Sequence, residues 1–247
     1  MKVTLVVPVL NEIVGLREYL PRLRTLPVDQ ILVLDGGSTD GTVQYAREEK
    51  CDLFVQTRPG MRMAYIEAYP KIRGDMVITF SPDGNSIPES IPTLIDKMRE
   101  GYDMVIASRY KEGARSDDDT ILTRLGNRAF TSLISRFGYP YTDALVIYRA
   151  YRRELPRQLG LTEERADWWE RSIGRWTSWE PQMSIRCAKA GLKIAEIPSD
   201  EPRRLGETGS VPFLPATRIQ HYRAGAACFT QLVEEVFVWR KDDLARK

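Results

Sequence analysis

The first third of the chain alternates short apolar runs with segments of helical periodicity. Apolar runs rich in β-branched residues occupy residues 3–10, 31–35, 51–57, 76–81 and 103–109. Helices are expected over residues 15–26, after Ser38, and over residues 64–72 and 91–100. Strands buried on both faces of a parallel sheet show such continuous apolar runs, and helices make the crossovers between them. The sequence therefore predicts an α/β fold with a mostly parallel sheet flanked by helices.

The pattern changes after the fifth apolar run. Residues 111–120 (KEGARSDDDT) are polar and acidic at their end, which predicts a loop and a candidate lid. The pattern beyond this loop is mostly helical until another apolar run at residues 192–198.

The C-terminal part of the chain has the pattern of an amphipathic helix. Its apolar positions share one helix face and are Phe229, Leu232, Val233, Val236 and Phe237. We therefore expect a main domain over residues 1–212 and a C-terminal amphipathic helical segment, residues 213–247, packed on it. A membrane-surface helix is the alternative, because Trp239, Arg240 and Lys241 follow the apolar face.

Composition narrows the range of partners. The 247 residues include 36 Lys and Arg and 34 Asp and Glu, so the chain lacks the one-signed charge typical of nucleic-acid binding, and we expect no such partner. Three widely spaced cysteines without a CxxC motif favour a reducing compartment. No apolar run reaches the roughly 18 residues of a membrane-spanning helix. These features predict a cytoplasmic protein whose membrane contact, if any, is peripheral and on the cytoplasmic face.

Polar residues lie at or directly after the ends of four of the apolar runs, where α/β sheets bind ligands. They lie in the segments Asn11-Glu12, Asp35 to Thr42, Ser81 to Asn85, and Ser108-Arg109. Asp35 begins the sequence DGGSTDGT, in which the glycines permit a tight turn and Ser38 or Asp40 can cap the next helix. This segment could be a strand-to-helix turn only. A carboxylate at a strand end can also accept hydrogen bonds from a nucleoside.

The order PVLNE, DGGSTDGT and an aspartate-bearing turn after an apolar strand resembles the family-2 glycosyltransferases of the GT-A fold. Residues 60–89 resemble the branch of that family that makes polyprenyl-phosphate sugars, and the whole resemblance extends over residues 1 to about 210. It implies a GT-A (Rossmann-like) sheet and inverting transfer from a UDP- or GDP-linked sugar. It also implies Mg²⁺ or Mn²⁺ as cofactor.

The resemblance assigns donor-site roles to several strand ends. The nucleotide-sugar-binding positions fall on Pro8, Leu10, Asn11, Glu12, Asp35 and Gly37. Asp83 takes the second position of the metal-binding DxD motif, and Asn85 stands where the synthase branch tends to carry glutamine, so both are expected to bind the metal. Ser81 takes the first DxD position and, unlike a carboxylate, brings no charge to a divalent cation.

The resemblance also places a catalytic residue on the acceptor side. Glu180 takes the position of the family's catalytic base. Trp179 stands where the family pattern has the first acid of a pair, and Gln182 stands where the synthase branch tends to carry glutamate. A hydroxyl acceptor must lose a proton as it attacks, whereas a lipid phosphate is already anionic and needs no base. Glu180 could also be a helix-start acid that interacts favourably with the helix dipole.

Several arginines match the family pattern, and guanidinium groups suit bidentate binding of phosphate. Arg109 and Arg62, which replaces a glycine usual in the family, are candidates for donor binding. Asp143, Arg149 and Arg203 match positions expected on the acceptor or phosphate side. A surface arginine can equally be a solvated charge with no ligand.

The resulting prediction is a glycosyltransferase that moves a sugar from a nucleotide-diphosphate donor to a polyprenyl phosphate or a small hydroxyl acceptor. The alternative is a sugar-nucleotide-binding protein without transferase activity, which would not need Glu180. A nucleotidylyltransferase fits less well, because the sequence has no Gly-rich N-terminal phosphate loop.

Overall fold

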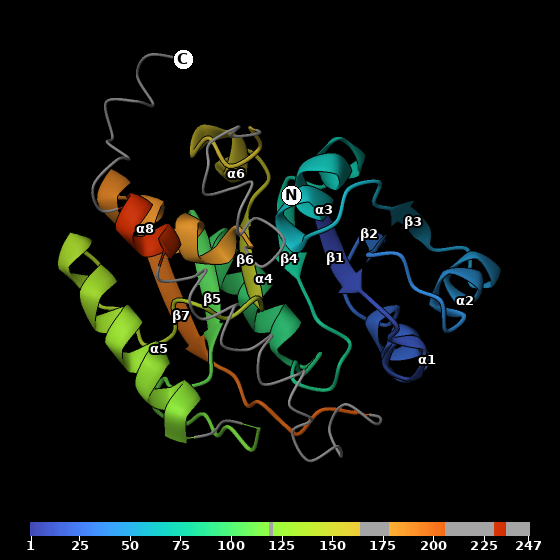
Figure 1. The fold of residues 1–247 in the computed structure, drawn as a ribbon, viewed down its shortest axis with the longest axis horizontal. Coiled ribbons are helices and arrows are strands. Elements are labelled where there is room, and N and C mark those ends of the chain that lie inside the picture. The colour runs from blue at the N-terminus through green and yellow to red at the C-terminus, as the bar shows by residue number, and fades with distance from the viewer. Residues whose placement is uncertain (119–120, 164–177, 206–229, 236–247) are drawn as a thin grey trace.

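A seven-stranded sheet forms the centre of the computed structural model, which describes residues 1–118, 121–163, 178–205 and 230–235 (Figure 1). Its strands are β1 (Val3–Val9), β2 (Gln30–Asp35), β3 (Asp52–Val55), β4 (Met76–Thr79), β5 (Met104–Ser108), β6 (Arg149–Arg152) and β7 (Ile194–Pro198). They lie in the order β3-β2-β1-β4-β6-β5-β7. Only β6 is antiparallel to its neighbours, β4 and β5, so the predicted mostly parallel sheet is confirmed.

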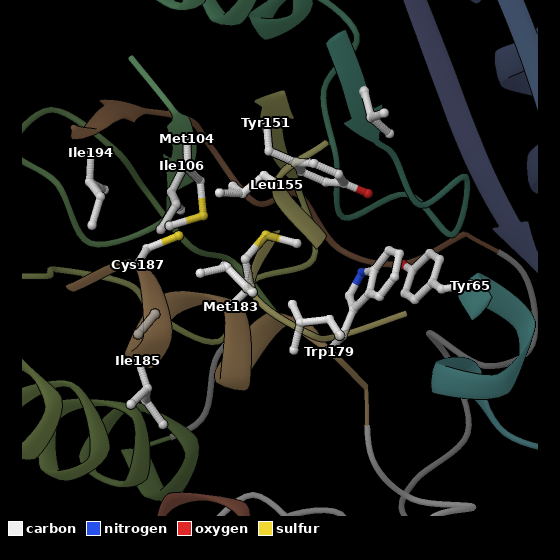
Figure 2. Packing of buried hydrophobic residues seen from close by; sticks show 14 of the residues in the cluster. Tyr65, Met104, Ile106, Tyr151, Leu155, Trp179, Met183, Ile185, Cys187 and Ile194 are labelled. Carbon is white, nitrogen blue, oxygen red and sulfur yellow. The ribbon is translucent and has the colours of Figure 1, made fainter. Parts of the chain in front are cut away.

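Helices cover both faces of the sheet. They are α1 (Ile13–Leu23), α2 (Thr42–Glu48), α3 (Met61–Ala68), α4 (Ser90–Arg99), α5 (Ile121–Ile134), α6 (Leu155–Gln158) and α8 (Glu180–Ala190), with short 3-10 turns η1 (Tyr69–Lys71) and η2 (Ser135–Phe137). Alternate residues of β1 enter two separate apolar clusters, since Leu5 and Val7 pack with α1 and α4 whereas Val6 packs on the side of α3. Figure 2 shows the second of these packings, where Met183 and Cys187 of α8 face Met104 of β5.

Strand β6 was missed by the sequence pattern, which predicted mostly helix in this part of the chain. The strand has only four residues, and its first, Arg149, is fully buried. The Arg149 guanidinium donates hydrogen bonds to the backbone carbonyls of Ala144 (3.2 Å), Val146 (2.5 Å) and Glu180 (3.2 Å). A buried arginine that bonds backbone carbonyls leaves no apolar signal in the sequence, so the prediction was wrong here.

Residues 230–235 form a helical turn that docks on α8. Glu235 is fully buried and accepts hydrogen bonds from Arg186 Nε (2.8 Å) and Gln182 Nε2 (3.1 Å). Leu232 is buried as predicted, but Val233 is 53% exposed, so the docked face is rotated away from the predicted apolar one. Phe229, Val236 and Phe237, and the predicted boundary near residue 212, lie outside the described residues.

The buried Arg186–Glu235 pair should contribute strongly to stability. We expect Glu235→Ala to lower the free energy of unfolding by about 3–5 kcal/mol, because the Arg186 charge would remain buried without its partner. Urea denaturation measures this change. Val233→Ala, on the exposed side of the same turn, should change the free energy of unfolding by about 0.5 kcal/mol or less. Equal effects of the two substitutions would contradict the prediction.

Candidate functional site

The loops that follow β1 and β2 are held together by side-chain hydrogen bonds. The backbone N–H of Asn11 donates to Ser38 Oγ (2.8 Å), and Asn11 Oδ1 accepts from the backbone N–H of Thr39 (2.8 Å). Asn11 has a φ of 57°, a conformation that asparagine tolerates better than most residues. Asp40 accepts from the backbone N–H groups of Ile13 (3.0 Å) and Thr42 (3.0 Å). The predicted residues Asn11 and Glu12 therefore lie beside the DGGSTDGT turn.

The two carboxylate oxygens of Asp35 differ in their hydrogen bonding. It is fully buried, and its Oδ1 accepts from the backbone N–H groups of Gly37 (2.8 Å) and Ser38 (2.9 Å). Its Oδ2 is buried and has no hydrogen-bond partner among the described residues. Buried carboxylate oxygens normally find a donor. The turn and the predicted nucleoside contact are thus compatible uses of the same side chain.

The turn after β4, which carries Asp83 and Asn85, is fixed from two sides. A Cβ atom on Gly15 would lie 1.9 Å from the Pro82 carbonyl oxygen, so only glycine lets α1 pack this closely. On the other side, the backbone N–H of Leu205 donates to the Asp83 carbonyl (2.7 Å). Gly84, with φ of +103°, lies against Leu205 and could not carry a side chain.

A cleft of about 220 Å³ opens between this turn and the ends of β5 and β7. Its wall contains three residues predicted for the site, Asp83, Asn85 and Arg109, together with Ser81. The segment leading into β6 also lines it through Leu145, Val146, Ile147 and Tyr148, and the segment after β7 contributes Ser199, Asp200, Glu201 and Arg204. The cleft therefore lies at the carboxyl edge of the parallel strands, as the sequence predicts.

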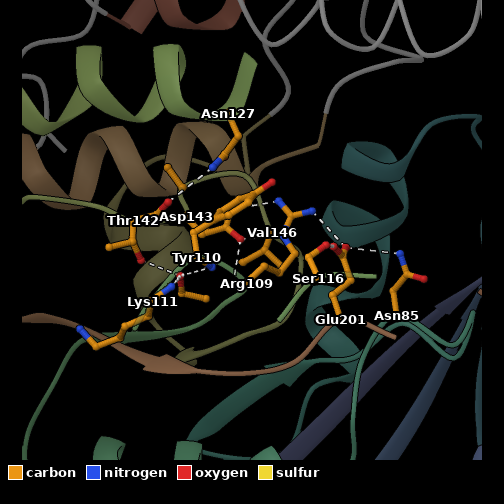
Figure 3. A network of polar contacts seen from close by, with 12 residues as sticks. Asn85, Arg109, Tyr110, Lys111, Ser116, Asn127, Thr142, Asp143, Val146 and Glu201 are labelled. Carbon is orange, nitrogen blue, oxygen red and sulfur yellow. Dashed lines mark hydrogen bonds and ion pairs between the residues drawn. The ribbon is translucent and has the colours of Figure 1, made fainter. Parts of the chain in front are cut away.

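Arg109 is held in the cleft by two carboxylates (Figure 3). Its Nε donates to Asp143 Oδ2 (2.6 Å), its Nη2 to Asp143 Oδ1 (3.1 Å) and its Nη1 to Glu201 Oε1 (3.1 Å). Burial alone would lower the pKa of Arg109, but the charges of Asp143 and Glu201 outweigh it and raise that pKa. Arg109 is thus a fixed cation in the cleft wall.

Asp143 supports Arg109 and does not present itself to a ligand. It is fully buried, and Glu196 of β7 accepts hydrogen bonds from the backbone N–H groups of Thr142 (3.0 Å) and Asp143 (3.0 Å). Burial raises the pKa of Glu196 above its usual value, although these hydrogen bonds oppose the shift. The predicted acceptor-side role of Asp143 is therefore better described as orientation of Arg109.

Three of the predicted site residues that do not line the cleft, Arg149, Arg62 and Glu180, are buried in the protein. Arg149 is buried among the carbonyls described above, so it is not retained as a phosphate contact. Arg62 is 3% exposed, and its guanidinium donates to Gln182 Oε1 (2.5 Å) and to the Glu163 carbonyl (3.0 Å). Glu180 is 2% exposed, and its Oε1 is buried without a hydrogen-bond partner among the described residues.

The surroundings of Glu180 are aromatic. The neighbouring Trp179 ring stacks on Tyr65 of α3 with centroids 4.6 Å apart, and Tyr151 of β6 meets Trp179 edge-on (Figure 2). Burial raises the pKa values of Tyr65 and Tyr151 well above 10, with the charge of Glu180 as the next cause. Glu180, the first residue of α8, therefore lies in the core near α3 and β6.

The remaining predicted residues have simpler environments. Pro8 is buried within β1, paired with Leu34 of β2. Leu10 is 59% exposed at the end of β1, and Arg203 is exposed beside the turn after β4. Gly37 has a φ of +98° and open space around it.

The sequence prediction missed Glu201, Arg204 and Asp118. Glu201 and Arg204 lie in the segment that follows β7, so the rule that located the other strand-end residues could have found them. Asp118 belongs to the 111–120 loop. Its Oδ2 accepts a hydrogen bond from Asn85 Nδ2 (3.0 Å) only because the chain folds back. No local signal in the sequence indicates that contact.

Comparison with known proteins identifies the family of this chain. The family described as "Glycosyl transferase family 2" matches residues 4–160. The chain belongs to glycosyl transferase family 2. Glycosyltransferase AglJ of Haloferax volcanii is 30% identical over 201 residues, which are 80% of this chain and 62% of that protein. Undecaprenyl-phosphate mannosyltransferase of Micrococcus luteus is 30% identical over 221 residues, 84% of this chain and 87% of that one.

The solved structures confirm the GT-A fold of this family 2 member. Glucosyl-3-phosphoglycerate synthase from Mycobacterium tuberculosis, in a complex with Mn²⁺, UDP and glucosyl-3-phosphoglycerate, superposes with a TM-score of 0.65. The match covers 97% of this chain and 81% of that one at 18% identity. The predicted GT-A architecture is therefore confirmed.

The oxygen atoms of Asp83 and Asn85 in the cleft are of the kind that binds a divalent metal. The described residues contain no group of three or more His, Cys, Asp or Glu that could hold a metal. Mg²⁺ and similar cations often use only one or two protein carboxylates, with water and substrate phosphate completing the shell. Asp83 supplies such a carboxylate, and Asn85 Oδ1 is buried with no hydrogen-bond partner in the described structure.

Glu12 makes the stability of this family 2 domain depend on pH. Burial, then the negative charge of Asp83, raises the pKa of Glu12 from 4.5 to about 7. The folded state therefore holds a proton that the unfolded chain releases, so stability should fall as the pH rises from about 4.5 to about 7. Glu12→Gln removes this dependence. The free energy of unfolding of the variant, measured by urea denaturation, should therefore increase relative to that of the unaltered protein between pH 5 and pH 8. A pH-independent difference between the two proteins would contradict the shift.

Proposed function

We propose that this family 2 glycosyltransferase binds a UDP- or GDP-linked sugar at the cleft and transfers the sugar, with inversion, to a polyprenyl phosphate. The observation that carries the proposal is the cleft itself. It has a carboxylate and an amide (Asp83, Asn85) on one wall and a fixed cation (Arg109) on the other.

The donor would lie along the edge from β2 to β5. Asp35 Oδ2, which has no hydrogen-bond partner among the described residues, suits a hydrogen-bond donor of the nucleoside, and Asp83 with Asn85 would hold Mg²⁺ or Mn²⁺ beside the diphosphate. When bound, such a metal neutralises charge that develops on the leaving diphosphate. Arg109 is already desolvated and oriented by Asp143, so it can stabilise phosphate charge without further reorganisation.

The location of Glu180 favours a phosphate acceptor. A hydroxyl acceptor needs a base within hydrogen-bond reach, and Glu180 is buried away from the cleft. A phosphate oxygen is already anionic and attacks without a base. Two features agree with this, the exposed Arg203 beside the turn after β4 and the undecaprenyl phosphate in the name of the Micrococcus luteus relative.

Helix α5 supports a peripheral contact with the membrane in which such an acceptor lies. No helix of the described part of the chain is long and apolar enough to cross a bilayer. On α5, however, Ile121 (81% exposed), Leu125 (59%) and Leu133 (41%) form a row at four- and eight-residue spacing. Exposed Arg128 continues the helix surface beside them, and α5 runs along the outside of the molecule (Figure 1). Exposed apolar residues with adjacent arginine suit an anionic bilayer surface.

The function is tested by an assay of sugar transfer from UDP- and GDP-sugars to polyprenyl phosphate and to free polyprenol, with Mn²⁺ or with chelator. We expect transfer to the phosphate only, and a loss of about 100-fold or more for Asp83→Ala because the metal loses its carboxylate. Asp96→Ala, which removes an exposed acid on α4, is the control. Donor binding without transfer to any acceptor would support the alternative, a sugar-nucleotide-binding protein.

The membrane contact is tested by sedimentation with vesicles that contain anionic phospholipid. Replacing Ile121 and Leu125 together by serine should weaken binding by about 10-fold or more, because two apolar side chains no longer leave water. Val233→Ser tests the C-terminal turn in the same way. A loss of binding with Val233→Ser alone would assign the contact to the C-terminal segment instead of α5.

A further inference from the structure

The loop after β5 is paired with the segment after β7. Ser116 and Glu201 form a parallel bridge, in which the backbone N–H of Glu201 donates to the Arg115 carbonyl (2.8 Å) and that of Asp117 to the Glu201 carbonyl (2.9 Å). The Ser116 hydroxyl also donates to the Glu201 carboxylate (Figure 3). This pairing fixes the next residue, Asp118, beside two residues of the cleft.

Asp118 and Asp83 share one cationic partner. Arg204 Nε lies 3.2 Å from Asp118 Oδ2 and 3.8 Å from Asp83 Oδ2. Asn85 joins the same two acids, because its Nδ2 donates to Asp118 Oδ2 (3.0 Å) and its backbone N–H donates to Asp83 Oδ1 (3.1 Å). Two carboxylates that approach one point repel each other unless a cation lies between them. The Arg204 guanidinium occupies that place.

We propose that Asp118 is the second carboxylate of the divalent-metal site and supplies the charge that Ser81 does not bring. Arg204 then acts as a stand-in cation that keeps Asp83 and Asp118 together before the metal and the donor bind. The proposal rests on the proposed function, because it assumes that the donor binds with a metal.

Accessibility is consistent with an exchange of cations. The side chains of Arg204, Asp118 and Asp83 are 41%, 30% and 17% exposed, so the ion pairs are open to solvent and weak enough to be replaced. A divalent ion carries twice the charge of guanidinium and prefers carboxylate oxygen ligands. Once released, the guanidinium of Arg204 has the geometry to pair with the incoming diphosphate.

The first test measures Mn²⁺ affinity by electron paramagnetic resonance of the free ion, with UDP or GDP present. Asp118→Asn should weaken Mn²⁺ binding by about 10-fold or more. Asp117→Asn is the matched control, because it removes the adjacent, exposed acid. Adding Ser81→Asp to the Asp118→Asn variant should restore binding, since the missing charge returns at the other position. Equal Mn²⁺ affinity for Asp118→Asn and Asp117→Asn would overturn the proposal.

The second test uses Mn²⁺ alone and does not depend on a nucleotide. Arg204→Gln removes the competing cation, so this variant should bind Mn²⁺ several-fold more tightly than the unaltered protein, and Arg115→Gln should not. Asp118→Asn in the Arg204→Gln background should abolish the gain. If no nucleotide binds, the proposed function fails, and this comparison alone decides whether Asp118 is a metal ligand. A gain that survives Asp118→Asn would overturn that assignment.

Discussion

The insertion of one antiparallel strand determines where the cleft can form. In a parallel sheet every strand delivers its following loop to the same edge, so neighbouring loops crowd one another. Strand β6 lies between β4 and β5 and runs the other way, so the chain enters it at that edge. The ends of β4 and β5 are thereby kept one strand apart, and the segment that leads into β6 lines the space between them. Asp83 and Asn85 lie across the cleft from Arg109 because of this arrangement.

The charges around the cleft are arranged before any ligand arrives. Asp143 and Glu201 orient Arg109, and Glu196 in turn fixes the backbone at Asp143. A guanidinium has five N–H donors, so Arg109 retains donors for a phosphate after these bonds are made. Opposing charges thus limit the cost of burying a cation in the cleft wall. The same principle applies on the other side, where Arg204 lies between two acids.

Local pattern was sufficient for most of the fold and for half of the site. The six parallel strands are largely apolar runs, and Asp35, Asp83 and Arg109 lie at or shortly after the ends of three of them, so position along the chain predicted position in space. Strand β6 and the buried Arg149 escaped prediction because backbone carbonyls satisfy the charge, and a sequence does not show which charges will be satisfied. Asp118 escaped because a tertiary pairing of two loops brings it to Asn85. The resemblance placed Glu180 on the acceptor side, but packing against Trp179 and Tyr65 puts it in the core.

The docking of Glu235 on α8 also bears on the order of folding during synthesis. Arg186 belongs to a central helix of the domain, yet its carboxylate partner is 49 residues later in the chain. Until that residue has left the ribosome, the nascent domain contains a core helix in which Arg186 lacks this carboxylate. The α8 side of the sheet therefore cannot reach its final packing while the chain is being made, whereas the half formed by β1 to β4 can. The half that contains β1 to β4 is expected to mature first, and the last part of the chain completes the other half.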